Sequence, residues 1–393
     1  MTGKKEIRVG LQWHSLREGN LGVGAFTLSH IYMLDAAAKA ANRKLSVCIY
    51  DPIGGPHWHP PRDIAVTELV YDLTKDVLPD TPLWRTVAEC DVILDIGAGE
   101  LTSDVYGGDL SFAVVCSRLA ALVQHKRLIL SPQTIGPFNS PYLQMLTEQL
   151  IRRCERTFTR DVESLQFLKG IGVHEGVEDC ADLAFRLPFE SQPKVSGQPL
   201  QFGLNVSGLL YLEASLNRFS FGLKVDYPAL IDRLIGRLKQ RSDVQITLVP
   251  HCVAEGSDNR HADDVWICRE LSERHQLPMA PRFKSPIEAK SFISGLDVLA
   301  GSRLHATIAA VSSGVPAIPL GHTRKFTGVF GAVSFPLVCD LRSNDEQGVL
   351  ACVDDSIGRL PELREAAVRS ARIAQSKLDN YQTFLNELML SLP

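Results

Sequence analysis

Short apolar, β-branched runs alternate with longer amphipathic segments along most of the chain. The first run, Ile7–Trp13, predicts a strand, and Ala25–Ala41 carries apolar residues at helical spacing. Runs without strict alternation of apolar and polar positions are typical of strands that are buried on both faces, as in a parallel sheet. The pattern therefore predicts an α/β fold in which helices cover both sides of parallel sheets.

The same pattern predicts elements in both halves of the chain. Further strands are expected at Leu45–Tyr50, Asp91–Ile96, Arg127–Ser131, Thr157–Thr159, Gln201–Val206, Val244–Pro250, Asp297–Ala300, Ala317–Leu320 and Pro336–Cys339. Further helices are expected at Leu110–Val123, Ser140–Cys154, Val162–Lys169, Tyr227–Gln240, Ala262–His275, Ile287–Ser294, Leu304–Ser313 and Leu360–Leu390.

The alternation pauses at Leu187–Pro199, which is rich in Pro, Ser, Gln and Gly. We interpret this stretch as a linker whose backbone has few partners, because 393 residues exceed the size at which one core stops growing, about 250–300 residues. Two Rossmann-like domains that face a cleft are expected, at 1–190 and 200–359, followed by a helical tail at 360–393. The first domain is expected to take an acceptor and the second a donor.

The composition narrows the class of protein. Lys plus Arg is 41 and Asp plus Glu is 45, so the net charge is −4, which argues against a nucleic-acid scaffold but leaves room for a local basic pocket. The most apolar stretch, Ser111–Val123, is interrupted by Ser117 and Arg118 and is shorter than the roughly 20 residues of a membrane span. No signal-peptide core follows the first lysines. Nine scattered cysteines without a C-x-x-C pair predict reduced thiols and a cytoplasmic location.

Ligands of open α/β sheets bind beyond the carboxyl ends of the strands, so the loops there are the places to search. Glycine-rich or rigid loops follow the first strand at Glu18–Gly24 and later strands at Gly97–Asp104 and Ser131–Phe138. Each could approach a ligand closely or could be a plain structural turn. The candidate ligand-binding residues in these loops are Asn20, Gly99, Asp104 and Gln133.

Arginine and histidine residues follow several strands. Arg160 stands at a strand end before Asp161, a good N-cap, and could bind phosphate or carboxylate or simply face solvent. The strongest cluster is Ser302-Arg303-Leu304-His305, which enters a helix directly after a strand. The next strand-end loop adds Arg324 and Lys325, so we expect a local cationic pocket in a net acidic protein.

Other histidines give weaker signals. His57 and His59 lie in a Gly/Pro/Trp-rich loop that could be a surface loop or a metal site, whereas His251 follows a strand and points toward the same cleft. No H-E-x-x-H motif, tight carboxylate cluster or G-x-S-x-G elbow supports a metal site or a serine hydrolase.

In order and spacing, these segments resemble the polysaccharide pyruvyl transferase family. The resemblance runs from about Val9 to Gly331 and rests on Asn20-Leu21-Gly22, Gly97-Ala98-Gly99 with Asp104, Ser131 to Pro137, Arg160 with Ser164, Asp182 to Phe185, Ser302 to His305, Gly314-Val315-Pro316 and Lys325. The family usually has Gly-Asp where this chain has Gly22-Val23, and often a Tyr before the lysine loop, where this chain reads Gly-His-Thr-Arg-Lys. These departures concern mainly the specificity for the acceptor.

The resemblance implies a fold similar to the GT-B glycosyltransferases. It also implies metal-independent transfer of the pyruvyl group of phosphoenolpyruvate onto two hydroxyls of a sugar, forming a ketal and releasing phosphate. No cofactor is expected beyond this donor, and the acceptor would be a sugar or oligosaccharide, with a lipid carrier left open.

The implied chemistry gives the candidate residues their roles. Arg160, Arg303 and Lys325 would bind the phosphate and carboxylate of the donor. His305 would protonate the vinyl carbon or donate to the leaving phosphate, with His251 as a second acid or base. The candidates for binding substrate, besides the three cations, are Asn20, Gly99, Asp104, Gln133 and Ser302.

Two alternatives stay open. The first is a nucleotide-sugar glycosyltransferase or epimerase of the same two-domain plan, with Glu255 or Asp258 on a ribose. The second is a non-catalytic relative that binds sugars or anions.

Overall fold

The chain forms two compact units, each built around a parallel sheet. The computed structural model describes residues 5–17, 19–51, 58, 60, 64–70, 79–104, 107–193, 198–216, 221–253 and 263–393. Unit 1 consists of Met1–Arg17, Phe26–Leu183 and Ala374–Pro393, and unit 2 of Glu18–Ala25 and Ala184–Ile373. Each unit therefore contains segments that are far apart in the sequence.

Unit 1 holds a seven-stranded sheet in the order β3-β2-β1-β4-β5-β6-β7, in which every pair is parallel. The order reverses between β1 and β4, which makes their carboxyl ends a topological switch point. The strands are β1 (Glu6–Gln12), β2 (Lys44–Asp51), β3 (Ala65–Val70), β4 (Val92–Asp95), β5 (Arg127–Gln133), β6 (Arg156–Thr159) and β7 (Val177–Asp179).

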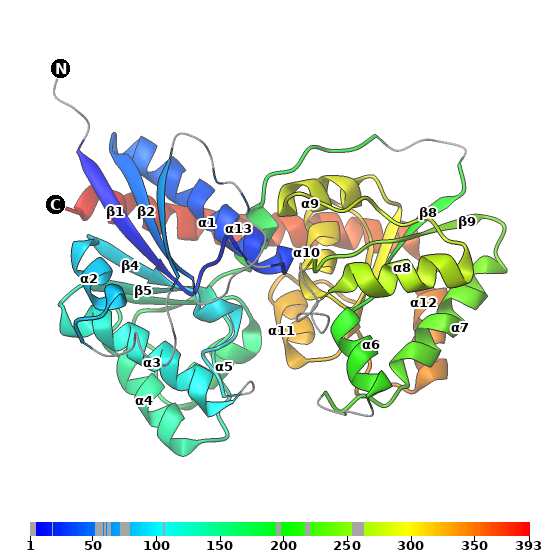
Figure 1. Ribbon diagram of the computed structural model, residues 1–393, viewed down its shortest axis with the longest axis horizontal. Coiled ribbons are helices and arrows are strands. Elements are labelled where there is room, and N and C mark those ends of the chain that lie inside the picture. The colour runs from blue at the N-terminus through cyan, green and yellow to red at the C-terminus, as the bar shows by residue number, and fades with distance from the viewer. Residues whose placement is uncertain are drawn as a thin grey trace. The chain divides into compact units, whose positions relative to one another are not determined.

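Helices cover both faces of this sheet (Figure 1). On one face, α1 packs with the end of α13, and Gln382 Nε2 donates to the Met33 carbonyl across them. On the other face, α2 and α3 share one apolar cluster, and α4 and α5 share another. The helices are α1 (Leu21–Ala40), α2 (Pro82–Glu89), α3 (Gly108–Val123), α4 (Pro141–Ile151), α5 (Val162–Gly170) and α13 (Leu360–Ser391), with short 3-10 turns η1 (Gly97–Gly99) and η2 (Leu183–Arg186).

A buried chain of polar side chains anchors α13 to unit 1. His14 Nε2 lies 2.9 Å from His30 Nδ1, and His30 Nε2 lies 2.9 Å from the Tyr381 hydroxyl. That hydroxyl is in turn 2.9 Å from Ser131 Oγ on β5. All four side chains are buried, and burial lowers the pKa of His14 to about 3 and that of His30 well below its usual value. Both imidazoles are therefore neutral, and this row of hydrogen-bonded side chains links α13 to the core of unit 1.

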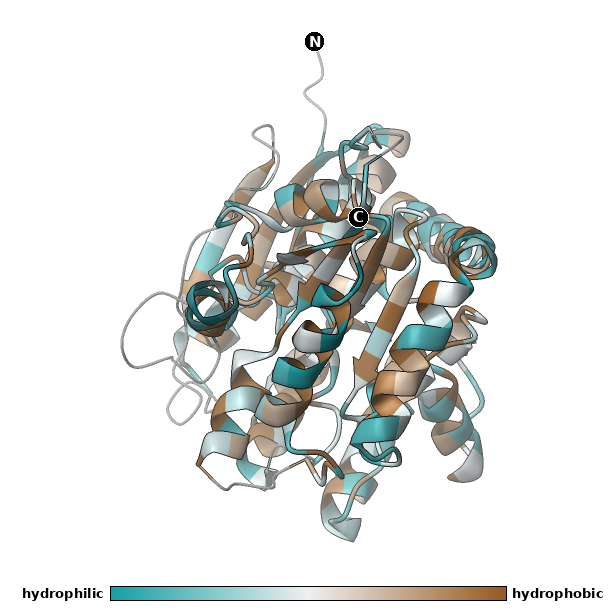
Figure 2. Ribbon diagram, turned by 90° about the vertical axis from the view of Figure 1, so that its right-hand side faces the viewer, coloured by the Kyte–Doolittle hydropathy of each residue, from teal (hydrophilic) through white to brown (hydrophobic). Residues whose placement is uncertain are grey.

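Unit 2 holds a five-stranded parallel sheet in the order β12-β11-β10-β8-β9, with its switch point between β8 and β10. Its strands are largely apolar and are covered by helices of mixed character (Figure 2). The strands are β8 (Leu200–Asn205), β9 (Val244–Leu248), β10 (Val298–Gly301), β11 (Ala317–Gly321) and β12 (Cys339–Asp340). The helices are α6 (Gly208–Ser215), α7 (Tyr227–Lys239), α8 (Asp264–His275), α9 (Pro286–Ser294), α10 (Leu304–Ser312), α11 (Arg324–Ala332) and α12 (Glu346–Gly358).

The α/β class with two parallel sheets is confirmed. The predicted strands and helices are present with shifts of a few residues at their ends, whereas β3, β7, α2, α6, α11 and α12 were not predicted. The units differ from the predicted ranges, because the chain enters unit 2 after Leu183 and the end of α13 belongs to unit 1. The assignment of an acceptor and a donor domain stays a prediction.

The described part of the expected linker is bonded to unit 2. Lys290 Nζ on α9 donates to the carbonyls of Phe185 and Leu187, at 3.3 and 2.8 Å. The amides of Glu190 and Gln192 donate to serine hydroxyls of α9. This corrects the expectation that the linker backbone has few partners.

Two findings bear on cysteines and membranes. Cys339 and Cys352 form a disulfide that joins β12 to α12, so not all nine cysteines are thiols, contrary to the expectation. Helix α1 is long and apolar enough to cross a membrane by length and composition, yet 78% of its most apolar window is buried in the protein. A core helix passes the same test.

Candidate functional site

Three strand ends of unit 2 are tied together by one asparagine. Asn205, the last residue of β8, accepts the Arg303 amide on its Oδ1 at 2.9 Å and donates from Nδ2 to the Val249 carbonyl at 2.9 Å. Its own carbonyl accepts the Ser302 amide. The loops after β8, β9 and β10 therefore share one fixed edge at the switch point, where ligands of such sheets bind.

His305 lies directly on the backbone of α1. A β-carbon built on Gly22 would stand 2.3 Å from His305 Nδ1 and 2.6 Å from its Cγ. Only glycine leaves room for the imidazole ring at this position. The glycine-rich turn and the Ser-Arg-Leu-His segment, both singled out in the sequence, thus meet in unit 2.

Asn20 fixes the start of α1 beside this ring. Its Oδ1 accepts the Gly22 amide at 3.0 Å, which is an N-cap bond. The Leu21 amide donates to the His251 carbonyl at 3.2 Å, and Asn20 forms a β-bridge with Cys252. The loop after β9 and the start of α1 therefore hold each other in place.

Asp264, a residue that was not among the candidates, is the centre of the site. Its buried carboxylate accepts the amides of Gly208, His251 and Cys252, at 2.9, 3.1 and 2.9 Å. It also accepts Arg303 Nη2 at 2.7 Å and Nε at 3.1 Å. Arg303 is therefore held in a buried ion pair, with only 16% of its side chain exposed.

His251 is a buried, uncharged imidazole. Burial, with the nearby charges of His305 and Arg303, lowers its pKa to about 3. Within the part of the chain that the structure describes, its Nδ1 has no hydrogen-bond partner. Near pH 7 the ring is therefore neutral, with one nitrogen protonated and the other able to accept a proton, and the low pKa makes it a weak base.

Ser302 and Lys325 take different places. The Ser302 hydroxyl is buried and accepts the Tyr227 hydroxyl at 2.8 Å, so it supports the loop after β10. Arg324 and Lys325 were expected in a loop but form the first turn of α11, after β11, the neighbour of β10. Both residues therefore lie at the carboxyl-end edge of the sheet, like the loop after β10, but within a helix.

Four candidates lie in unit 1, and Arg160 is buried there rather than facing solvent. Its Nη1 donates to Asp182 Oδ2 at 2.8 Å, its Nε donates to Thr134 Oγ1 at 3.1 Å, and 2% of its side chain is exposed. Its guanidinium stands 5.3 Å from the ring centroid of Phe26. A β-carbon on Gly99 would approach Arg160 Nη1 to 3.3 Å, so this glycine turn packs against the arginine.

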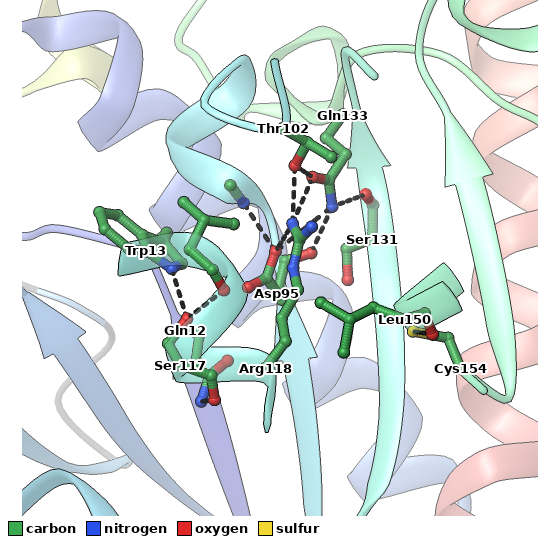
Figure 3. A network of polar contacts seen from close by, with 12 residues as sticks. Gln12, Trp13, Asp95, Thr102, Ser117, Arg118, Ser131, Gln133, Leu150 and Cys154 are labelled. Carbon is green, nitrogen blue, oxygen red and sulfur yellow. Dashed lines mark hydrogen bonds and ion pairs between the residues drawn. The ribbon is translucent and has the colours of Figure 1, made fainter. Parts of the chain in front are cut away.

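Gln133 and Asp104 have structural partners. Gln133 is fully buried, accepts Arg118 Nη2 at 3.0 Å and donates to the Asp95 carbonyl at 2.8 Å (Figure 3). Arg118 and Asp95 form an ion pair with no exposed surface. Asp104 accepts the amides of Asn139 and Ser140, at the start of α4. Both candidates therefore shape loops of unit 1, and their contact with substrate stays a prediction.

Some residues of interest fall outside the described part of the chain. His57, His59, Glu255 and Asp258 lie there, so the structure does not place them. Among the described residues, no group of three or more His, Cys, Asp or Glu could hold a metal. Metal independence stays a prediction.

Comparisons with known proteins identify the family of this chain. A family model described as polysaccharide pyruvyl transferase matches residues 17–324, which is most of the chain. The chain belongs to this family. The match includes His251, Arg303 and His305 and ends one residue before Lys325. A relative of this family member is the amylovoran biosynthesis protein AmsJ of Erwinia amylovora, 22% identical over 303 residues, which are 73% of this chain and 71% of AmsJ.

Solved structures show that this family member has the fold of GT-B glycosyltransferases and related epimerases. A putative UDP-N-acetylglucosamine 2-epimerase from Listeria monocytogenes has a TM-score of 0.56 at 13% identity, covering 93% of this chain and 91% of its own. HepE of Anabaena, solved with UDP-glucose, has a TM-score of 0.53 at 12% identity, covering 98% of both chains. At such identities the likeness is one of fold alone.

Proposed function

We propose that this protein transfers the pyruvyl group of phosphoenolpyruvate onto two hydroxyls of a sugar in a polysaccharide or its precursor. Family membership supports a pyruvyl transferase, and the observation that carries the proposal is the contact of His305 with Gly22 at the switch point of unit 2. This contact gives the closing motif of the family a fixed place beside the first one. The reaction would take place in the cytoplasm and would use no cofactor besides the donor.

The cations at this edge suit a donor that carries a phosphate and a carboxylate. Helix α10 starts after Arg303 and α11 starts with Arg324 and Lys325, both behind neighbouring parallel strands. A helix start attracts anions, and the two basic residues in the first turn of α11 would add to the attraction for an anionic donor. Phosphate is the natural anion there, with Lys325 as a point charge.

The transfer balances in two steps. In the first, C3 of phosphoenolpyruvate takes a proton, and a sugar hydroxyl bonds to C2 while losing its proton. In the second, another hydroxyl of the same sugar bonds to C2, the C–O bond to phosphate breaks, and that hydroxyl's proton leaves with the phosphate or on a base. His305 is the proposed proton donor, and neutral His251 beside it is the proposed acceptor.

For Arg303, which was expected to bind the donor, the ion pair with Asp264 suggests a second role. Because its guanidinium is paired with Asp264, it carries less free charge toward a donor than an unpaired arginine would. We propose that Arg303 mainly fixes the loop after β10 and turns its remaining surface toward the donor. Arg160, paired with Asp182, is proposed to act in the same way in unit 1.

Two variants of His305 test the mechanism. His305→Ala is expected to lower phosphate release from phosphoenolpyruvate and acceptor by about 10²–10⁴-fold, with donor affinity little changed. His305→Gln, which keeps a neutral donor, is expected to be nearly as inactive, because an amide cannot protonate carbon. Near-normal turnover of the Gln variant would exclude the acid role.

Calorimetry separates this proposal from the nucleotide-sugar alternative. The wild-type protein is titrated with phosphoenolpyruvate and, separately, with UDP-sugars. Binding of phosphoenolpyruvate with phosphate release on adding acceptor supports the proposal. Tight binding of a UDP-sugar without phosphoenolpyruvate binding would replace it, and binding without turnover would indicate a non-catalytic relative.

A further inference from the structure

The outer face of α3 in unit 1 is apolar from Phe112 to Val123. Phe112, Leu119 and Val123 are 48%, 40% and 60% exposed, and Cys116 between them is half-buried. Their spacing of four, three and four residues places them on one stripe of the helix. The solvent-facing side of a surface helix normally carries polar or charged residues, and this stripe of α3 carries apolar ones instead.

Helix α4, the neighbour of α3, also carries exposed apolar side chains. It contacts α3 on the same face of the sheet, and the two helices lie side by side in Figure 1. On it, Tyr142 and Met145 are 58% and 51% exposed. Of the eight large hydrophobic side chains that are exposed in the described part of the chain, five lie on these two helices. We call this surface the α3–α4 face, formed by Phe112, Cys116, Leu119, Val123, Tyr142 and Met145.

Two copies of α3 could pack against each other through this stripe if the helices run antiparallel. Its positions are symmetric about the middle of the helix, between Ser117 and Arg118. Reversing a second copy therefore places Phe112 against the partner's Val123, and Cys116 against the partner's Leu119. Both centre residues are buried, so Arg118 adds no charge to the stripe.

Charges at the two ends of α3 match the same arrangement. Asp109 is exposed in the first turn, and Lys126, whose Nζ donates to the carbonyls of Ala88 and Cys90, follows the last turn. In antiparallel packing, the carboxylate at the start of one helix faces the basic end of the other, and the helix dipoles oppose each other favourably.

We propose that the α3–α4 face is the interface between two copies of this chain, related by a two-fold axis across the middle of α3. A two-fold interface must be self-complementary, as this stripe is. A membrane-binding face would attract anionic lipids through its cations, whereas Arg152 pairs with Glu148 and Arg127 with Glu155.

The interface would steady a buried network as well as cover apolar surface. The inner side of α3 carries Arg118, which binds Asp95 at the end of β4 and Gln133 at the end of β5. A second copy packed on the outer side would restrict motion of the helix that holds these two strand ends. The dimer is thus expected to stiffen the switch point of unit 1.

The mass of the full-length protein in solution tests the proposal directly. Wild type is expected to have twice the mass of one chain by light scattering, and Leu119→Lys the mass of one chain with an unchanged circular dichroism spectrum. Leu216→Lys is the matched control, because Leu216 is 48% exposed at the end of α6 in unit 2, and it should stay dimeric. A monomeric wild type, or a dimer that survives Leu119→Lys, overturns the proposal.

Cross-linking tests the direction of the packing. L119C should form a disulfide with the partner's Cys116 on oxidation, and trypsin separates the two positions because it cuts after Arg118. A cross-link between the two introduced thiols without one to Cys116 would contradict the antiparallel arrangement. Flotation with anionic vesicles is the third measurement, and a monomer whose vesicle binding is lost in Leu119→Lys would assign the face to a membrane instead.

Discussion

Replacing Gly22 by alanine should remove activity without removing stability. The new methyl group would stand 2.3 Å from His305 Nδ1, whereas unstrained contacts of this kind begin at 3.4 Å. The imidazole must therefore move by about 1 Å. A displacement of this size at a reacting group costs about 10²-fold in rate. We expect phosphate release to fall by about that factor.

Stability should change little or even increase. Gly22 lies in α1, and alanine is the better helix former by up to about 1 kcal/mol, which offsets the cost of moving a side chain. Gly236→Ala in α7 is the matched control, because a β-carbon there meets nothing within 4 Å. It should gain similar helix stability at unchanged turnover.

Turnover, the melting temperature and the imidazole NMR signals of His305 are measured for both variants. Wild-type turnover in Gly22→Ala, together with shifted His305 signals, would refute the reasoning that the position of this ring limits the rate. An unfolded Gly22→Ala protein would refute the stability argument.

Other predictions concern the ion pairs and one histidine. Arg303→Ala should destabilise the protein by about 3–5 kcal/mol in urea unfolding, because it leaves a buried carboxylate unpaired, and adding Asp264→Asn should restore part of that loss. Arg160→Ala should destabilise by a similar amount through Asp182, and its melting temperature should recover in part with Asp182→Asn. His251 has a pKa of about 3 when folded and a usual value of 6.5, so the unfolded chain binds the extra proton between these pH values and stability rises with pH there. His251→Gln should lower the pH dependence of the unfolding free energy across that range by up to about 1.4 kcal/mol per pH unit, and an unchanged slope would contradict the buried neutral imidazole.

The fold and the Arg303–His305 segment of the candidate site were within reach of sequence reasoning. Apolar runs without alternation predict parallel strands because both faces of such strands are covered, and both sheets have this form. Arg303 and His305 were singled out because they directly follow a buried strand, at the sheet edge where ligands bind.

The partners of the charged residues were not predictable in the same way. Asp264 stands at a helix start, where aspartate is common. The sequence around it does not predict that its carboxylate points inward and pairs with Arg303. Arg118 was noted only as an interruption of an apolar run, and its burial against Asp95 was not predicted. Pairing between distant elements depends on which way a side chain turns, and local pattern carries no information on this.

The division of the chain has a consequence for how the protein is made. Unit 1 is completed by Ala374–Pro393, and Tyr381 from this segment closes the buried polar chain that starts at His14. Unit 2 begins with the short stretch at Glu18–Ala25, synthesised long before the rest of it. On the ribosome, the first unit must therefore wait for the last residues of the chain, and neither unit can be cut out as one continuous fragment without losing part of its own core.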